Sequence, residues 1–328
     1  MVSREQKASW TAEQVALAKL RVEEDCLDWE AGQDGNFPGL SRVGGVDVSF
    51  FADGTYAIAA IVVLDFPSLK VVYERSAAFR LTVPYVPGFL AMREVPALSQ
   101  MFKDVPRHAL PQVVLVDGNG AFHPRRCGAA THLGISIDLP TIGVAKDVLK
   151  VGEVNSSVAR RLAHTLHRPR EWAPLCSVAA LLKTKGSRCL VVSPGHRLSL
   201  ETAVALTSQL CRYAAPEPIR QADLRSRNAV RAWYAGAELD YLEAPRLSHL
   251  EQMLQITSRD GTSPEAFQSP EIQAAKTKAA RWVIKGSREE PAPPKTSAET
   301  ESTPETHFWT GIFGWLCVCF TRSHTRQI

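Results

Sequence analysis

Residues 42–81 read RVGGVDVSFFADGTYAIAAIVVLDFPSLKVVYERSAAFRL, and this stretch decides the fold. It contains three runs rich in β-branched and aromatic residues, at 42–51, 55–66 and 69–81. The pairs Asp53-Gly54 and Pro67-Ser68 separate the runs, and both pairs have the chemistry of turns. Because connections this short join neighbouring antiparallel strands, we expect a three-stranded antiparallel meander.

Downstream of the meander the pattern alternates between helices and strands. PYVPG at 84–88 interrupts it, and a helix is expected at 89–103. PQVVLVDG at 111–118 predicts a fourth strand, and the helix and short strand expected at 124–134 and 141–145 favour parallel pairing. The remaining predicted elements are a hairpin and two helices, at 177–184 with 189–195, at 199–213 and at 218–235.

Together these elements predict an α/β fold, a mixed sheet made of the antiparallel three-strand meander plus parallel strands, with helices on both faces. The RNase H-like fold has this order of elements. Ahead of it, Thr11 with Gln14 predicts a capping box for a helix over 12–28. We therefore expect three regions: an N-terminal helix and linker at 1–40, the folded domain at 41–245, and a mostly disordered tail with a short apolar end at 246–328.

The composition places the chain among globular proteins. Of its 328 residues, 45% are hydrophobic and 22% are charged, and the formal net charge of +4 is compatible with nucleic-acid binding. We expect no transmembrane segment, because the apolar run at 308–320 is shorter than the ~20 residues that span a bilayer. The seven cysteines are scattered without zinc-ligand spacing, which indicates reduced thiols in a cytoplasmic or nuclear protein.

Two aspartates sit in or at the end of predicted strands. Asp47 interrupts the apolar run VGGVDVSF, where a carboxylate is costly to bury, and Asp117 ends the fourth strand. Alone, Asp47 could accept backbone hydrogen bonds and Asp117 could form an Asx-turn before Gly118. If the two strands are neighbours, the carboxylates repel each other unless a cation or a proton lies between them. Oxygen ligands suit Mg²⁺ or Mn²⁺, which can activate water and polarise a phosphodiester.

Four further residues have both a functional and an ordinary interpretation. Glu94 could join the acidic site or lie on a helix surface, and Asp223 could join it or pair with Arg227 one helical turn away. Lys146, at a strand end, could balance phosphate charge or be solvated. His196 could contact a phosphate, donate a proton to a leaving oxygen, or simply fill a loop.

The segments around these residues carry basic and aromatic side chains. His123, Arg125 and Arg126 could clamp backbone phosphates or could be an ordinary helix start, although positive charge opposes the dipole there and so favours an anionic partner. PYVPG holds Tyr85 between prolines, and a rigid aromatic of this kind can wedge between bases. The alternative is a Pro-rich turn with Tyr85 packed on the surface.

Six segments together closely resemble the endonuclease V family of inosine-directed nucleases. They are VGGVDVSF, PYVPGFLAMRE, LVDGNGAFHPRRCGAATHLG, IGVAKDVL, SPGHRLSLETAV and PEPIRQAD, in family order from about Val43 to Arg227. The resemblance implies an RNase H-like fold and Mg²⁺-dependent hydrolysis, with Mn²⁺ able to replace Mg²⁺. Cleavage would fall at the second phosphodiester bond 3′ to an inosine and would leave a 3′-hydroxyl and a 5′-phosphate.

The resemblance also implies roles for individual residues. The implied catalytic set is Asp47, Glu94, Asp117, Lys146, His196 and Asp223, with Asp47 and Asp117 as the metal ligands. The implied strand-separating wedge is Pro84, Tyr85, Val86 and Pro87, followed by Gly88.

Asn119, in DGNG, stands where bacterial members of that family have His, and it resembles the animal members. Animal relatives favour inosine in RNA, so we expect inosine-containing single-stranded RNA as the partner. Two alternatives stay open: a deoxyinosine-specific DNA repair nuclease, and an inosine-RNA-binding protein that does not cleave. Residues 155–176 match the family poorly, which leaves the substrate-side loop there undefined. We expect a monomer in the cytoplasm and in the nucleus, including the nucleolus.

Overall fold

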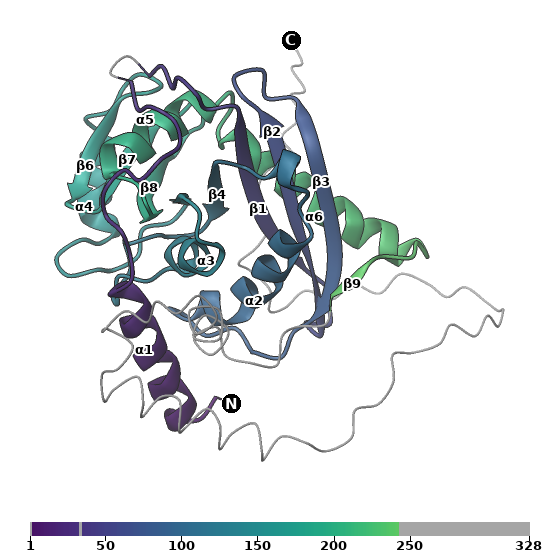
Figure 1. Ribbon diagram of the computed structural model, residues 1–328. Helices are drawn as coiled ribbons and strands as arrows, with labels where there is room; N and C mark the ends of the chain where they lie inside the picture. The colour runs from purple at the N-terminus through teal and green to yellow at the C-terminus, as the bar shows by residue number, and fades with distance from the viewer. Residues whose placement is uncertain (1, 33–34, 243–328) are drawn as a thin grey trace, which may run out of the picture. The chain divides into compact units, whose positions relative to one another are not determined.

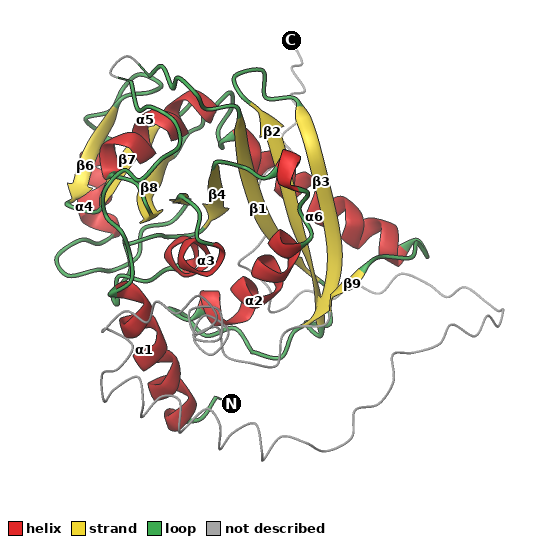
Figure 2. Cartoon of the chain, viewed as in Figure 1, coloured by secondary structure: helices red, strands yellow, loops and turns green. Residues whose placement is uncertain are grey.

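The computed structural model describes residues 2–32 and 35–242, and within them a single mixed sheet organises the fold (Figures 1 and 2). The sheet has nine strands in the order β6-β7-β8-β5-β4-β1-β2-β3-β9. The strands are β1 Arg42–Phe50, β2 Tyr56–Asp65, β3 Val71–Arg80, β4 Val113–Asp117, β5 Thr141–Ala145, β6 Trp172–Cys176, β7 Ala179–Lys183, β8 Cys189–His196 and β9 Tyr241–Leu242. The helices are α1 Arg4–Ala18, α2 Leu90–Lys103, α3 Ala129–Ile137, α4 Ser156–Ala163, α5 Leu200–Leu210 and α6 Glu217–Tyr234, with a 3₁₀ turn at Arg107–Ala109.

The predicted strand pairing is confirmed. β1, β2 and β3 form an antiparallel meander, and β4 pairs in parallel with both β1 and β5. β7 and β8 form the predicted hairpin, and β8 runs antiparallel to β5. The direction of β8 matters for the site, because it carries the end of β8 to the edge of the sheet where β5 begins.

Helices cover both faces of the sheet, as predicted, and each face has its own apolar core. α5 and α6 pack on one face with residues such as Leu115 and Ile142. α2 and α3 pack on the other face with residues such as Val46 and Val116. Figure 1 shows α2 and α3 in front of the sheet and α6 running behind β1, β2 and β3. No helix in the described ranges is long and apolar enough to cross a membrane.

The N-terminal helix starts and ends earlier than predicted. α1 spans Arg4–Ala18, because the Ser3 hydroxyl, not Thr11, caps it by accepting a hydrogen bond from the Gln6 backbone at 3.1 Å. Thr11 lies inside the helix and donates to the Lys7 carbonyl at 2.8 Å. Residues after α1 run along the end of β8 instead, where the Val22 carbonyl accepts from the Arg197 backbone N–H at 2.9 Å.

Other predicted boundaries also need correction. The helix expected at 124–134 begins only at Ala129, because the preceding residues form a loop in which Arg126 has a positive φ of 58°. The helix capped by Ser199 ends at Leu210 instead of 213. α4 and β6 were not predicted, and both lie mostly in the region 155–176 that resembles the family poorly. The tail predicted at 246–328 lies outside the described residues.

Candidate active site

Asp47 and Asp117 lie side by side on neighbouring parallel strands. Val46 of β1 pairs with Val116 of β4, and each aspartate is the next residue along its strand. Asp117 is the last residue of β4, at the carboxyl edge of the sheet, and its side chain is 25% exposed. The strand order predicted from sequence therefore produces the expected pair of carboxylates.

The partly buried Asp47 carboxylate is stabilised by a serine that sequence reasoning missed. Ser226, on α6, donates from its hydroxyl to Asp47 Oδ2 at 2.7 Å, and its oxygen is 2.7 Å from the Ser49 hydroxyl. α6 reaches this close to β1 because Gly45 has no side chain: a Cβ there would lie 2.2 Å from the Pro218 backbone. Burial raises the pKa of Asp47, and the hydrogen bond from Ser226 partly opposes that rise.

Glu94 lies against the same two aspartates, and the surface interpretation of this residue is wrong. It is on α2, on the opposite face of the sheet from α6, and is only 8% exposed. Burial, together with the charges of Asp47 and Asp117, raises the pKa of Glu94 to about 8. Near neutral pH, Glu94 therefore keeps its proton unless a cation is present.

Lys146 supplies positive charge to the cluster. It follows β5, and its Nζ donates to Asp117 Oδ2 at 2.7 Å. Burial alone would lower the pKa of Lys146, but the charges of Asp117 and Asp47 raise it. The ammonium is therefore protonated at neutral pH, and 60% of the side chain is exposed.

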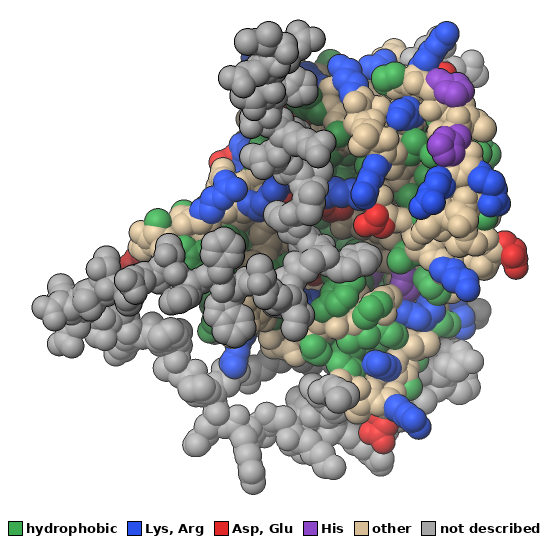
Figure 3. Space-filling view, turned by 180° about the vertical axis from the view of Figure 1, so that it is seen from behind, with side chains coloured by type: hydrophobic (Ala, Val, Ile, Leu, Met, Phe, Trp, Pro, Cys, Tyr) green, Lys and Arg blue, Asp and Glu red, His purple; other side chains and the backbone are tan. Residues whose placement is uncertain are grey.

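Asp223 lies beside the cluster, in an ion pair with Arg227 one helical turn along α6. The ordinary interpretation of Asp223 as an intrahelical partner is therefore confirmed. The pair also belongs to the site electrostatically, since the Arg227 charge lowers the pKa of Asp47. Figure 3 shows Lys and Arg side chains spread over the face seen from behind, with few carboxylates among them.

The loop after Asp117 is clamped across two strands. The Gly120 N–H donates to the Ser193 hydroxyl at 2.8 Å, and the Ala121 N–H donates to the Pro194 carbonyl at 2.8 Å. The loop lies directly on Gly143, where a Cβ would be 2.2 Å from the Gly120 nitrogen. The segments IGVA and SPG therefore hold this loop in place.

The structure does not bring His196 to the carboxylates. His196 pairs with Thr141 at the start of β5, whereas Lys146 follows the other end of that strand. Its ring is 4% exposed, Nδ1 accepts from the Val22 backbone at 3.2 Å, and Nε2 lies 3.7 Å from Asp138. This position corrects the prediction of a phosphate or leaving-group contact, because the imidazole instead fastens the segment after α1.

His123 and Arg125 also differ from the phosphate clamps that we predicted. His123 Nε2 donates to the Gly88 carbonyl at 3.1 Å, and Arg125 Nη2 donates to the same carbonyl at 2.5 Å. Burial, with the charge of Arg125, lowers the pKa of His123 to about 4, so this imidazole is neutral. Both side chains hold the PYVPG loop, on which Tyr85 is 65% exposed. Arg126 is exposed and makes no such contact among the described residues.

The donor chemistry of the carboxylate cluster fits a hard divalent cation. Within the described ranges no group of three or more acidic, His or Cys side chains is arranged so that it could hold a metal ion. Mg²⁺ does not require such a group, because it is commonly held by one or two carboxylates with water and substrate phosphate oxygens as the other ligands. Asp47 and Asp117 provide those carboxylates, Glu94 lies next to them, and the Lys146 ammonium on Asp117 shows that the site attracts positive charge.

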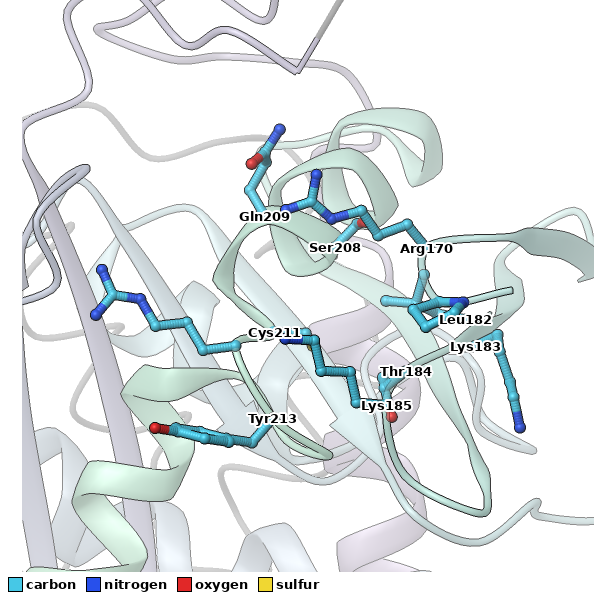
Figure 4. Close-up of a pocket in the computed structure, with 11 residues that line it drawn as sticks. Arg170, Leu182, Lys183, Thr184, Lys185, Ser208, Gln209, Cys211 and Tyr213 are labelled. Carbon is cyan, nitrogen blue, oxygen red and sulfur yellow. The ribbon is translucent and has the colours of Figure 1, made fainter. Parts of the chain in front are cut away.

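A pocket of about 360 Å³ lies elsewhere, and no predicted site residue lines it (Figure 4). It is formed by the end of β7 and the end of α5, with Arg170, Lys185 and Tyr213 among its lining residues. Its basic side chains lie at the carboxyl end of α5, where positive charge complements the helix dipole. The reaction chemistry is therefore assigned to the carboxylate cluster and not to this pocket.

The mixed sheet and the carboxylates across β1 and β4 define an RNase H-like protein, and comparison with known proteins identifies the family. The family model for Endonuclease V matches residues 27–224. Endonuclease V of Homo sapiens is 45% identical over 234 residues, which cover 68% of this chain and 82% of the human protein. Endonuclease V of Mus musculus is also 45% identical over 234 residues, covering 68% of this chain and 69% of the mouse protein. The chain belongs to the endonuclease V family and is an inosine-directed endonuclease.

Solved structures agree with this assignment. The crystal structure of the catalytic domain of human Endonuclease V aligns with a TM-score of 0.67 and 43% identity, over 71% of this chain and 99% of that one. Ciona intestinalis Endonuclease V, solved in complex with a 23mer DNA containing an inosine followed by a ribo-adenosine, aligns with a TM-score of 0.62 and 32% identity, over 71% of this chain and 100% of that one.

Proposed function

We propose that this protein is a Mg²⁺-dependent endoribonuclease that cleaves inosine-containing single-stranded RNA. It cuts the second phosphodiester bond 3′ to inosine and leaves a 3′-hydroxyl and a 5′-phosphate. The observation that carries the proposal is the pair Asp47 and Asp117 on adjacent strand ends, with buried Glu94 beside them and the Lys146 ammonium on Asp117. We further propose that it acts as a monomer in the cytoplasm and nucleus, including the nucleolus. The five described cysteines are all free, which agrees with a reducing compartment.

The residues of this chain divide the chemistry as follows. Asp47 and Asp117 would hold the Mg²⁺, which supplies Lewis-acid polarisation of the phosphodiester and lowers the pKa of a bound water. Water adds to phosphorus and gives up a proton, the P–O3′ bond breaks, and the 3′ oxygen takes a proton from solvent; on the way, negative charge builds on the phosphoryl oxygens and on the departing 3′ oxygen. Protonated Lys146 offsets this charge from its place on Asp117. Ser226 keeps the Asp47 carboxylate oriented and ionised.

Glu94 and the Asp223–Arg227 pair surround this centre. Glu94 is able to keep its proton at neutral pH and to lose it when positive charge enters the cluster. The Asp223 carboxylate is held by Arg227, which fixes its direction on α6. These two groups are placed to orient water around the ion, which is the role that we propose for them.

The preference for RNA is supported by a ribonucleotide in a related complex. The Ciona intestinalis relative was solved with DNA in which a ribo-adenosine follows the inosine. A 2′-hydroxyl is the group by which a protein distinguishes RNA from DNA at a given site. Asn119, which resembles animal members of the family, points in the same direction.

Three matched oligonucleotides test the proposal. One is DNA with a single deoxyinosine, the second is the same DNA with one ribonucleotide after the inosine, and the third is RNA with inosine at that place. Each is incubated with Mg²⁺ and with chelator, and the products are mapped at nucleotide resolution. We expect metal-dependent cleavage of the second and third strands one nucleotide beyond inosine.

Variants and alternative outcomes make this test decisive. Asp117→Asn should lose at least 100-fold in kcat, whereas Asp53→Asn, in the exposed β1–β2 turn, should cleave like the natural protein. Equal cleavage of all three strands would establish the DNA repair alternative in place of RNA specificity. Tight binding of inosine strands without product, in the presence of Mg²⁺ or Mn²⁺, would establish the non-cleaving alternative.

A further inference from the structure

The loop PYVPG has an exposed tip and an apolar base. Tyr85, at the tip, is 65% exposed. At the base, Val83 and Val86 pack with Phe89 and Trp10 in one apolar cluster, and Trp10 comes from α1. The ring centroids of Trp10 and Phe89 are 5.5 Å apart. Helix α1 is therefore part of the packing that supports the loop.

A single carbonyl at the end of this loop receives three donors. The Gly88 oxygen accepts from Arg125 Nη2 at 2.5 Å, from His123 Nε2 at 3.1 Å and from Gln14 Nε2 at 3.3 Å. Gly88 has a φ of +80°, a conformation that glycine adopts without strain. Three donors on one carbonyl fix the direction in which the loop leads into α2, and one of them comes from α1.

Gln14 is the residue that joins the three segments. Its side chain is buried, with 1% of the residue exposed. Besides Gly88, Nε2 donates to the Cys127 carbonyl at 3.1 Å, and Oε1 accepts from Arg125 Nε at 2.6 Å. The Arg125 guanidinium in turn lies 4.2 Å above the Phe89 ring. The amide is thus fully hydrogen-bonded, and it binds α1 both to PYVPG and to the loop that follows Asp117.

We propose that α1 is a brace for the Tyr85 loop, and that Gln14 and Trp10 are positioning residues that set the angle of the tip toward the carboxylates. Helix α1 precedes residues 27–224, which the family model matches. This inference rests on the proposed function and on the strand-separating role that the family resemblance implies for residues 84–87. A braced tip is needed when base pairs must be opened and is dispensable when the inosine is already unpaired.

The test compares one strand in two states. The strand is DNA with inosine followed by one ribonucleotide, used alone or annealed to a complement that pairs inosine with cytosine. The measurement is kcat/KM for each state and the ratio of the paired to the unpaired value. Gln14→Leu removes all three hydrogen bonds with little change in size, and we expect it to lower the ratio at least tenfold. Gln6→Leu is the matched control, since it makes the same change on α1 at a half-exposed site and should leave the ratio unchanged.

Two further variants keep the inference falsifiable. If Gln14→Leu melts far below the natural protein, Gln14→Glu replaces it. The carboxylate keeps the contact with Arg125 but loses the hydrogen bonds donated to the Gly88 and Cys127 carbonyls. The expected fall in the ratio is then at least threefold. Tyr85→Ala tests the wedge directly. The brace would be overturned if Tyr85→Ala lowers the ratio while the Gln14 variants keep a normal ratio or lose kcat/KM equally on both states. The proposed function would then stay intact. Absence of cleavage at inosine by the natural protein in either state would overturn both.

Discussion

Glu94 gives the structure a strong dependence on pH. Burial and the charges of Asp47 and Asp117 raise its pKa from 4.5 to about 8. When a carboxyl group has a higher pKa in the folded chain than in the unfolded chain, its contribution to stability is fully present at a pH below its unfolded pKa. That contribution is lost as the pH rises from about 4.5 through about 8. At 1.36 kcal/mol per pKa unit, this rise corresponds to roughly 5 kcal/mol in the free energy of unfolding.

The variant Glu94→Gln isolates this contribution, because the amide keeps the shape of the side chain and cannot ionise. Urea unfolding at pH 5, 6.5 and 8 with chelator should show the natural protein losing several kcal/mol across the series and Glu94→Gln losing much less. Saturating Mg²⁺ should flatten the decline of the natural protein, because positive charge favours the ionised cluster. Glu153→Gln, at an exposed position, should keep the natural pH dependence. Identical slopes for the natural protein and Glu94→Gln would refute the assignment of a raised pKa to Glu94.

Three other substitutions test separate parts of the site. Ser226→Ala removes a hydrogen bond to the Asp47 carboxylate, an interaction of about 1.5–3 kcal/mol. The pKa of Asp47 should therefore rise, and the acidic limb of the kcat/KM–pH profile should move to higher pH. An unmoved limb would contradict the role of Ser226. Gly143→Ala places a Cβ 2.2 Å from the Gly120 nitrogen, and calorimetry should show a lower Tm with a loss of about 1–3 kcal/mol in stability; a Tm equal to that of the natural protein would show that the loop yields. His196→Gln should lower the Tm while changing kcat of the folded enzyme less than threefold, and a hundredfold fall in kcat with an unchanged Tm would restore the predicted phosphate contact.

The core of the fold follows from local patterns. The three runs over 42–81 are joined by turn residues, so their antiparallel order depends on nothing distant in the chain. Asp47 and Asp117 then become neighbours through the strand order alone, since β1 can pair with β4 only on its free side. The burial of Glu94 follows from the same strand order. The sequence prediction left open whether Glu94 lies on the helix surface, because the helix pattern alone does not show which side of α2 meets the aspartates.

The sequence predictions fail where two local signals compete for one helix start, or where the direction of a strand decides which residues meet. Ser3 with Gln6 and Thr11 with Gln14 are both capping boxes by spacing, and α1 uses the earlier one. The side chain of Gln14 is used in tertiary contacts with the loop after Asp117, which the sequence near α1 does not show. For His196 the missing information was the antiparallel direction of β8, which carries its last residue away from Lys146.

Resemblance to a family does not by itself separate chemical from packing roles. His123 and Arg125 lie in the same similar segment as Asp117, yet they hold the Gly88 carbonyl, and Gly143 serves only to let the loop approach β5. The reason is geometric: the loop after Asp117 must be fixed at both ends for the carboxylate to stay beside Asp47. One end is clamped to β8 through Ser193, and the other meets the Tyr85 loop. A nuclease that must place a bond next to a cation needs this rigidity as much as it needs the ligands, so residues that never touch the substrate still contribute to the site by holding its loops.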